Sequence, residues 1–303
     1  MTAATADWIA CDWGTSNLRL WAMQGTGVIA ARHSDRGMAA MSGPQDFADE
    51  LARMTDGWPA VPVVACGMVG ARQGWIEVPY RTVPCPAIPA LTPVPGDPGG
   101  RPVLIAGGVM QTQPPDVMRG EETQIAGVLA ARPDFDGVIC LPGTHTKWVR
   151  ISAGEICHFQ TVMTGEVFAL LRNQSVLRHS MSDGATDPQT TGFADAVSDA
   201  LSRPHQAWAR LFRLRAADLN GNAPPGSAEA ALSGTLIGLD LGAARPYWLG
   251  EQVLILGAPH LAALYAQALE LQGAAPITGD ADTATRAGLY AAWRHHMAHP
   301  PQP

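Results

Sequence analysis

A strand, a Gly-Thr corner and a returning strand occur twice in this chain, and this repeat constrains the fold more than any other feature. The first corner is Gly14-Thr15, and the second corner, Gly143-Thr144, follows 129 residues later. The same offset of 129 residues aligns Cys140 with Cys11. Two meanders of one design predict a duplicated α/β architecture, with one copy in each half. Two unrelated hairpins are the alternative interpretation.

Hydrophobic periodicity predicts strands and helices in alternation along the chain. Strands are expected over residues 8–12, 17–23, 28–31, 61–65, 103–106, 138–142, 147–151, 156–159 and 253–257. Helices are expected over 45–54, much of 116–131, 165–173, 193–201, 206–216, 227–243, 260–271 and 283–297, the last with Asp282 as its N-cap. The proline-rich stretch 82–102 is expected to be an extended surface loop.

The composition excludes several classes of protein. Apolar residues make up 47% of the 303 residues, which is enough for buried cores. The net charge of −7 argues against a nucleic-acid-binding protein, which needs a clustered basic surface. There is no apolar run of membrane-spanning length, and residues 1–7 lack a signal-peptide pattern, so we expect no membrane partner. Five cysteines without CxxC spacing favour a reducing, cytoplasmic location.

The two corners are suited to binding phosphate. A glycine lets the backbone N–H groups approach an anion closely, and the threonine adds a hydroxyl. Asp12, just before the first corner, can order Mg²⁺ through water. Two corners that face each other across a cleft would bind a nucleoside triphosphate from both sides. Lys147, which follows the second corner, is the only lysine beside 19 arginines, so we expect either a phosphate contact there or chance.

A second unusual site is Arg119-Gly120-Glu121-Glu122, at the start of an expected helix. Acidic residues are favourable in the first turn of any helix, and this is the structural interpretation. The functional interpretation makes one of these carboxylates the general base that accepts a proton from an attacking hydroxyl.

Other residues leave two interpretations open. His145 could contact phosphate or cap its turn, and Thr164 and Glu166 could start a helix or bind substrate. Arg72 lies in a glycine-rich loop after an expected strand, where it could meet a small anion. Gly257, after a strand, fits close approach to a flat ring or an ordinary strand–helix turn.

Four motifs, in order over residues 8–175, resemble the 2-dehydro-3-deoxygalactonokinase family. They are DWGTSNLR at 12–19, PDVMRGEETQ at 115–124, LPGTHTKWV at 141–149 and MTGEVF at 163–168, with a weaker likeness in SGTLIG at 233–238. The resemblance implies the sugar kinase/actin/chaperone-ATPase fold, with two ribonuclease-H-like domains around a nucleotide cleft. We expect these domains at 1–118 and 119–303, with the last helix free to pack back on the first domain.

The resemblance also implies roles for single residues. Gly14, Thr15 and Ser16 would form the first phosphate loop, and Gly143, Thr144 and His145 the second. Gly257 would belong to the adenosine motif, Asp12 would order Mg²⁺, and Arg19 would lie near the transferred phosphoryl group. Asn17 is expected on the substrate side. Related kinases carry a catalytic Asp a little over twenty residues before the second loop, where this chain has Glu121 and Glu122, and we favour Glu122. Leu141 stands where the first corner has Asp12, so one metal-ordering carboxylate is expected.

The function implied by the resemblance is ATP-dependent phosphorylation of the 6-hydroxyl of 2-dehydro-3-deoxy-D-galactonate, in galactonate catabolism. A kinase for an epimeric acid such as 2-dehydro-3-deoxygluconate is one alternative. A nucleotide-dependent regulator of the same fold, which transfers no phosphate, is another. The sequence leaves open whether the chain forms a homo-oligomer.

Overall fold

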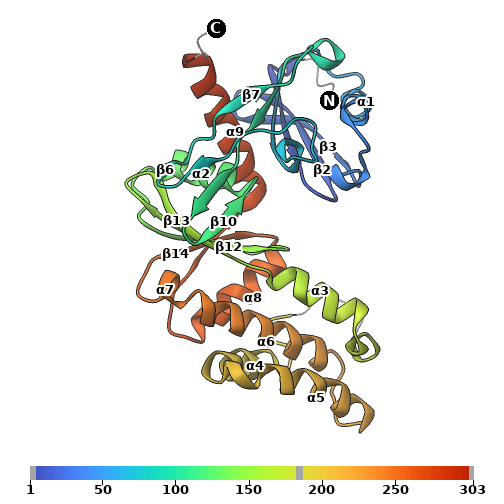
Figure 1. The fold of residues 1–303 in the computed structure, drawn as a ribbon, viewed down its shortest axis with the longest axis vertical. Helices are drawn as coiled ribbons and strands as arrows, with labels where there is room; N and C mark the ends of the chain where they lie inside the picture. The colour runs from blue at the N-terminus through green and yellow to red at the C-terminus, as the bar shows by residue number, and fades with distance from the viewer. Residues whose placement is uncertain (1–4, 182–186, 300–303) are drawn as a thin grey trace. The chain divides into compact units, whose positions relative to one another are not determined.

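A computed structural model describes residues 5–181 and 187–299 (Figure 1). The first residues on which the expectation of no signal peptide depends therefore lie outside the described residues. Contacts divide the chain into two compact units. The first unit contains residues 1–135, 152–158 and 281–303, and the second contains 136–151 and 159–280. In the described part of the chain, no helix is long and apolar enough to cross a membrane.

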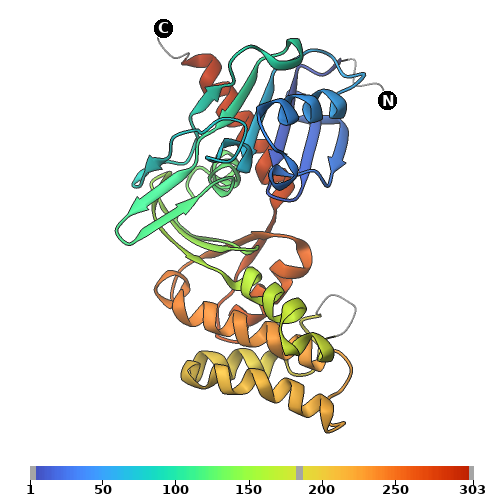
Figure 2. The same cartoon turned by 45° about the vertical axis from the view of Figure 1, so that its right-hand side comes forward.

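The first unit is built on a sheet with the strand order β3-β2-β1-β4-β8-β7. Its strands are β1 (Trp8–Trp13), β2 (Leu18–Gln24), β3 (Gly27–Ser34), β4 (Val63–Gly67), β7 (Leu91–Pro93) and β8 (Val103–Ala106). Helix α1 (Pro44–Met54) packs its apolar side chains, such as Phe47, on one face, where Ile9 and Cys11 point. Helix α9 (Ala281–Ala298) lies on the other face (Figure 2). There Leu289 of α9 belongs to the same core cluster as Trp8. The alternation of side chains along β1 thus fills two cores.

Helix α2 (Glu121–Ala131) packs very closely against α9. A Cβ atom on Gly127 would lie 1.9 Å from the carbonyl oxygen of Ala284, and one on Gly288 would lie 1.8 Å from that of Thr123. These two glycines therefore let the helix backbones touch. A small sheet of β5 (Arg81–Thr82), β9 (Val109–Thr112) and β10 (Pro115–Met118) precedes α2.

The second unit repeats the strand order of the first. Its strands have the order β13-β12-β11-β14-β15. In the first unit β1 pairs antiparallel with β2 and parallel with β4, and in the second unit β11 pairs antiparallel with β12 and parallel with β14. The bounds are β11 (Gly137–Leu141), β12 (Thr146–Ser152), β13 (Glu155–Val162), β14 (Val253–Gly257) and β15 (Ile277–Asp280). Residues 152–158, where β12 turns into β13, belong to the first unit, and Ile156 pairs there with Cys85 of β6 (Cys85–Pro86). The duplicated architecture is confirmed.

Helices α4 (Phe193–Ser202), α6 (Ser227–Ala243), α7 (Arg245–Trp248) and α8 (Pro259–Glu270) form a core with the face of the second sheet where Cys140 and Trp148 point. Helices α3 (Thr164–Gln174) and α5 (Ala207–Leu219) pack on α6 in a separate apolar cluster that contains Leu232 and Leu236. In Figure 1, α4 and α5 lie beside α6.

Four details differ from the sequence-based expectations. The stretch 82–102 contributes β6 and β7, and β10 occupies the start of the expected helix 116–131. Strand β15 was not expected. Asp282 lies within the first turn of α9 and is not its N-cap, because the helix already begins at Ala281. Residues 119–135 group with the first compact unit because α2 packs on α9, and the domain boundary at 118/119 stays a prediction.

Candidate active site

The first corner is hydrogen-bonded to the backbone of a short helical turn, Met38–Ala40. Gly14 N–H donates to Asn17 C=O, and Ala39 N–H donates to Thr15 C=O, both at 2.9 Å. A Cβ on Gly37 would lie 2.4 Å from the Thr15 carbonyl oxygen, so that position has no room for a side chain. Thr15, Ser16 and Asn17 are exposed. The corner is therefore fixed in shape and accessible to a ligand.

Asp12 lies at the end of β1 and forms an ion pair with Arg19, its partner across the hairpin to β2. The second guanidinium nitrogen of Arg19 pairs with Asp282, in the first turn of α9. The Asp12 side chain is 15% exposed. Burial raises the pKa of the Asp12 carboxyl, while the nearby charge of Arg19 lowers it. The structure thus brings Asp12 and Arg19 together and adds Asp282 to them.

Gly67, at the end of β4, brings three segments of the first unit together. Its φ of +90° favours glycine, and a Cβ there would lie 2.7 Å from the Trp13 carbonyl oxygen. A Cβ on Gly120, before α2, would lie 3.3 Å from the Gly67 Cα. The ends of β1 and β4 and the start of α2 therefore meet here. Cys66 donates a hydrogen bond to Asp12 (3.9 Å), and its thiol pKa is raised by burial and then by the charges of Asp12 and Glu122.

The two neighbouring glutamates have different environments. Glu122 is fully buried, and its carboxyl accepts hydrogen bonds from Gly120 N–H (2.7 Å) and the Thr123 hydroxyl (3.1 Å). Burial, and then the charge of Glu121, raise the pKa of Glu122 to about 8. Glu121 is partly exposed and accepts a hydrogen bond from Arg119 N–H at 3.0 Å. Only Glu121 has a surface that a substrate can reach in this conformation.

Arg72 is in the loop that follows β4, but its side chain is 80% exposed and pairs with Glu77 at 3.3 Å. The structure does not bring it into the group formed by Asp12, Arg19 and the start of α2.

The second corner packs against the N-terminus of α3. A Cβ on Gly165 would lie 2.2 Å from the Gly143 carbonyl oxygen, and Glu166 N–H donates to Thr144 C=O at 2.9 Å. The His145 ring bonds the Glu166 carboxylate at 2.5 Å. Thr164 and Glu166 therefore start a helix, and they do so beside the second corner. The positive end of a helix dipole favours anions at this place.

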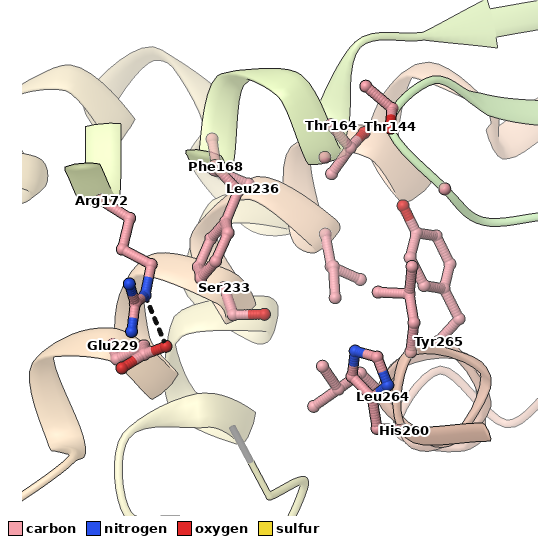
Figure 3. A pocket seen from close by; sticks show the side chains of 14 residues that line it. Thr144, Thr164, Phe168, Arg172, Glu229, Ser233, Leu236, His260, Leu264 and Tyr265 are labelled. Carbon is pink, nitrogen blue, oxygen red and sulfur yellow. Dashed lines mark hydrogen bonds and ion pairs between the residues drawn. The ribbon is translucent and has the colours of Figure 1, made fainter. Parts of the chain in front are cut away.

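A cavity of about 410 Å³ extends from the second corner between α3, α6 and α8 (Figure 3). Thr144 and Thr164 are at one end, and the buried Glu229 with its partner Arg172 (3.0 Å) is at the other. Apolar side chains such as Phe168, Leu236 and Leu264 line much of the space between. An apolar cavity that ends on a Gly-Thr corner and a helix N-terminus is suited to a nucleotide.

Gly257 and Lys147 lie outside the residues that line this cavity. A Cβ on Gly257 would lie 3.0 Å from the Pro142 ring, so the glycine allows β14 to approach the second corner. Lys147 is buried, and its ammonium donates to the Thr161 hydroxyl at 2.9 Å. Because strand residues alternate, Lys147 points to the sheet face opposite Trp148, away from the helices that line the cavity.

The donor set fits a magnesium ion that is bound mainly by phosphate. Among residues 5–181 and 187–299, no three His, Cys, Asp or Glu side chains are grouped to hold a metal. Mg²⁺ in phosphoryl-transfer sites takes one or two carboxylates and otherwise phosphate and water. Asp12, beside the first corner, is the candidate for such a carboxylate.

Comparison with known proteins gives the family. The family model for 2-keto-3-deoxy-galactonokinase matches residues 12–292. The chain belongs to this family. It is 39% identical to a protein from Rhizobium meliloti named probable 2-dehydro-3-deoxygalactonokinase DgoK1, over 94% of this chain and 96% of that protein. It is 36% identical to the 2-dehydro-3-deoxygalactonokinase of Escherichia coli, over 94% and 97% of the two chains.

Solved structures agree with the 2-keto-3-deoxy-galactonokinase assignment. A Sinorhizobium meliloti protein described as a 2-dehydro-3-deoxygalactonokinase superposes with a TM-score of 0.86 at 38% identity, over 97% of this chain and all of that one. An activator of 2-hydroxyisocaproyl-CoA dehydratase from Clostridium difficile has a TM-score of 0.50 at 12% identity, over 96% and 95% of the two chains, and so shares the fold alone. The α/β fold expected from the sequence, that of the actin-like ATPases, is confirmed.

Sequence reasoning missed three polar residues around the site of this kinase-family chain. Asp282 is distant in sequence from Arg19, and Glu229 and Asp240 lie in a helix that reads as mainly apolar. The sequence signal for Glu229 and Asp240 is an acidic residue within an otherwise apolar helix, and both side chains are buried.

Proposed function

We propose that this chain transfers the γ-phosphoryl group of ATP to the 6-hydroxyl of 2-dehydro-3-deoxy-D-galactonate. The observation that carries the proposal is the group around Gly67, where the start of α2 brings Glu121 to the ends of β1 and β4 that hold Asp12. A regulator that only binds nucleotide has no need of an accessible carboxylate there. The free thiols of the chain, four of them buried, also favour a cytoplasmic location.

We assign the nucleotide to the second unit. The base and ribose occupy the cavity between α3, α6 and α8, and the phosphates lie at Gly143, Thr144 and the N-terminus of α3. Arg19 contributes positive charge toward the phosphates, and Asp12 orders the Mg²⁺, which would neutralise phosphate charge when bound. We retain Lys147 as a second positive charge near the second corner, although its side chain lies on the sheet face opposite the cavity. Phosphoryl transfer has a loose transition state, so positioning and charge neutralisation supply most of the catalysis.

We assign the sugar acid to the first unit, with Asn17 near its hydroxyls and Arg72 as the partner of its carboxylate. The exposed ion pair between Arg72 and Glu77 is weak, so a substrate carboxylate can compete for it. Glu121 replaces Glu122 as the proposed base, because a base must reach the proton that it accepts. Glu122, protonated at neutral pH and bonded to Gly120, positions the turn before α2.

A coupled assay of ADP release tests the proposal. The reaction is run with 2-dehydro-3-deoxy-D-galactonate, with its gluconate epimer and without a sugar acid. We expect release that depends on the galactonate acid, and mass spectrometry should show the phosphate on the terminal carbon. A preference for the epimer would change the substrate, and release without any sugar acid would favour a plain ATPase.

A further inference from the structure

Asp240, on α6, is a buried carboxylate that three side chains from three other elements bond. It is 1% exposed. One carboxylate oxygen accepts a hydrogen bond from the Trp148 indole at 2.8 Å. The other accepts from the Thr164 hydroxyl at 2.5 Å and from the Tyr265 hydroxyl at 2.6 Å. Tyr265 also bonds the Thr146 hydroxyl at 2.8 Å.

These partners surround the proposed phosphate end of the nucleotide cavity. Thr146 and Trp148 begin β12, directly after the second corner. Thr164 is the first residue of α3, which packs against that corner through Gly165. Tyr265 lies on α8, and both Thr164 and Tyr265 line the cavity (Figure 3). The Asp240 carboxylate thus links β12, which follows the corner, to α3, which packs against the corner, and to α8.

The bonding pattern requires an acceptor at every point. An ionised carboxylate offers only acceptors, so it can take all three hydrogens at once. An amide of the same size would turn an N–H group toward at least one of these donors. The loss of one bond in a buried network leaves a polar group unpaired, which costs about 1–3 kcal/mol.

We propose, on the basis of the function proposed above, that Asp240 is a positioning residue for the nucleotide. It holds Thr164 and Tyr265 so that the α3 N-terminus and the second corner keep the shape that the phosphates need. Because both hydroxyls donate to Asp240, they present only lone pairs to the cavity. Phosphate oxygens are therefore bound by backbone N–H groups of the corner and α3, and not by these hydroxyls.

Asp240→Asn tests this proposal by isothermal titration calorimetry with ADP, together with the KM for the sugar acid. We expect the Kd for ADP to rise about tenfold or more, the effect of one unpaired buried group. The KM for the sugar acid should stay within about twofold, because a purely local loss in the second unit does not reach the acceptor residues.

A matched variant separates positioning from general loss of stability. Glu50→Gln also disrupts a buried carboxylate, which bonds Ser34 and Arg53 in the first unit, and it should lower the melting temperature without changing the Kd for ADP. Should Asp240→Asn fail to fold, Tyr265→Phe and Thr164→Val remove one donor each, and we expect each to raise the Kd for ADP. An unchanged Kd in folded Asp240→Asn, or in both single-donor variants, overturns the proposal. Wild-type protein that binds no ADP overturns the proposed function and this inference together. ADP binding with no phosphoryl transfer contradicts the proposed function alone.

Discussion

The guanidinium of Arg19 forms an ion pair with the carboxylate of Asp282, which lies 263 residues later in the sequence. Arg19 also pairs with Asp12, so one cation lies between two carboxylates at the end of β1. Arg286, one turn further along α9, lies over the ring of Trp21, 5.4 Å from its centre. The first turns of the last helix are thus bonded to β2, and Asp282 helps to hold Arg19 beside Asp12.

Asp282→Asn should lower turnover by about tenfold, because Asp12 still holds Arg19 and the loss stays below the roughly 10²-fold that a displacement of about 1 Å in an active site can cost. Both partners are more than one-third exposed, so the free energy of unfolding should fall by less than about 1 kcal/mol. Steady-state kinetics and urea unfolding measure the two effects. Asp195→Asn, in the first turn of α4, is the matched control and should change neither. Wild-type turnover in Asp282→Asn would show that Arg19 needs only Asp12.

Glu121→Gln should lower kcat by roughly 10²-fold or more, as expected for the loss of a general base. The Kd for ADP should not change, because Glu121 belongs to the acceptor side. Rapid-quench measurement of a single turnover, together with calorimetry, separates the two quantities. If Glu121→Gln retains near-normal turnover and Glu122→Gln does not, the base is Glu122 and the buried carboxyl must become accessible during the reaction.

Glu122→Gln should change how stability depends on pH. The carboxyl has a pKa of about 8 when folded and near 4.5 when unfolded, so the folded state binds the extra proton between these values. The stabilisation is fully present at low pH and is lost as the pH rises toward 8. Urea unfolding at pH 5, 6.5 and 8 should show the free energy of unfolding of wild type falling along this series. In Glu122→Gln the fall should be smaller, and an equal fall in both proteins would contradict the assigned pKa.

Lys147→Met keeps the aliphatic stem and removes the charge. If the ammonium acts on phosphate, ADP should bind several-fold more weakly, in the range expected for the loss of one charged hydrogen bond. Thr161→Val is the control, since it removes the hydroxyl partner and leaves the charge. ADP binding equal to that of wild type in Lys147→Met would make the lone lysine a structural residue.

The amino-acid sequence was sufficient for features that depend on neighbours in the chain. The alternation along 17–23 and the glycine at each corner determine two meanders, because strand pairing through a short turn is a local property. The motifs around Asp12, Glu121 and Gly143 likewise indicate a kinase family, and the match to the family model over residues 12–292 confirms it.

Tertiary structure alone decided which of the candidate groups meet, and in what environment. Glu121 and Glu122 are adjacent in sequence, yet one is partly exposed and the other is buried beside Cys66 with a raised pKa. Asp240 and Asp282 acquire their roles only when distant segments pack, through contacts with Trp148 and Arg19. The burial of a side chain and the charges around it depend on the packing of residues far apart in the chain, so a local sequence pattern cannot predict them.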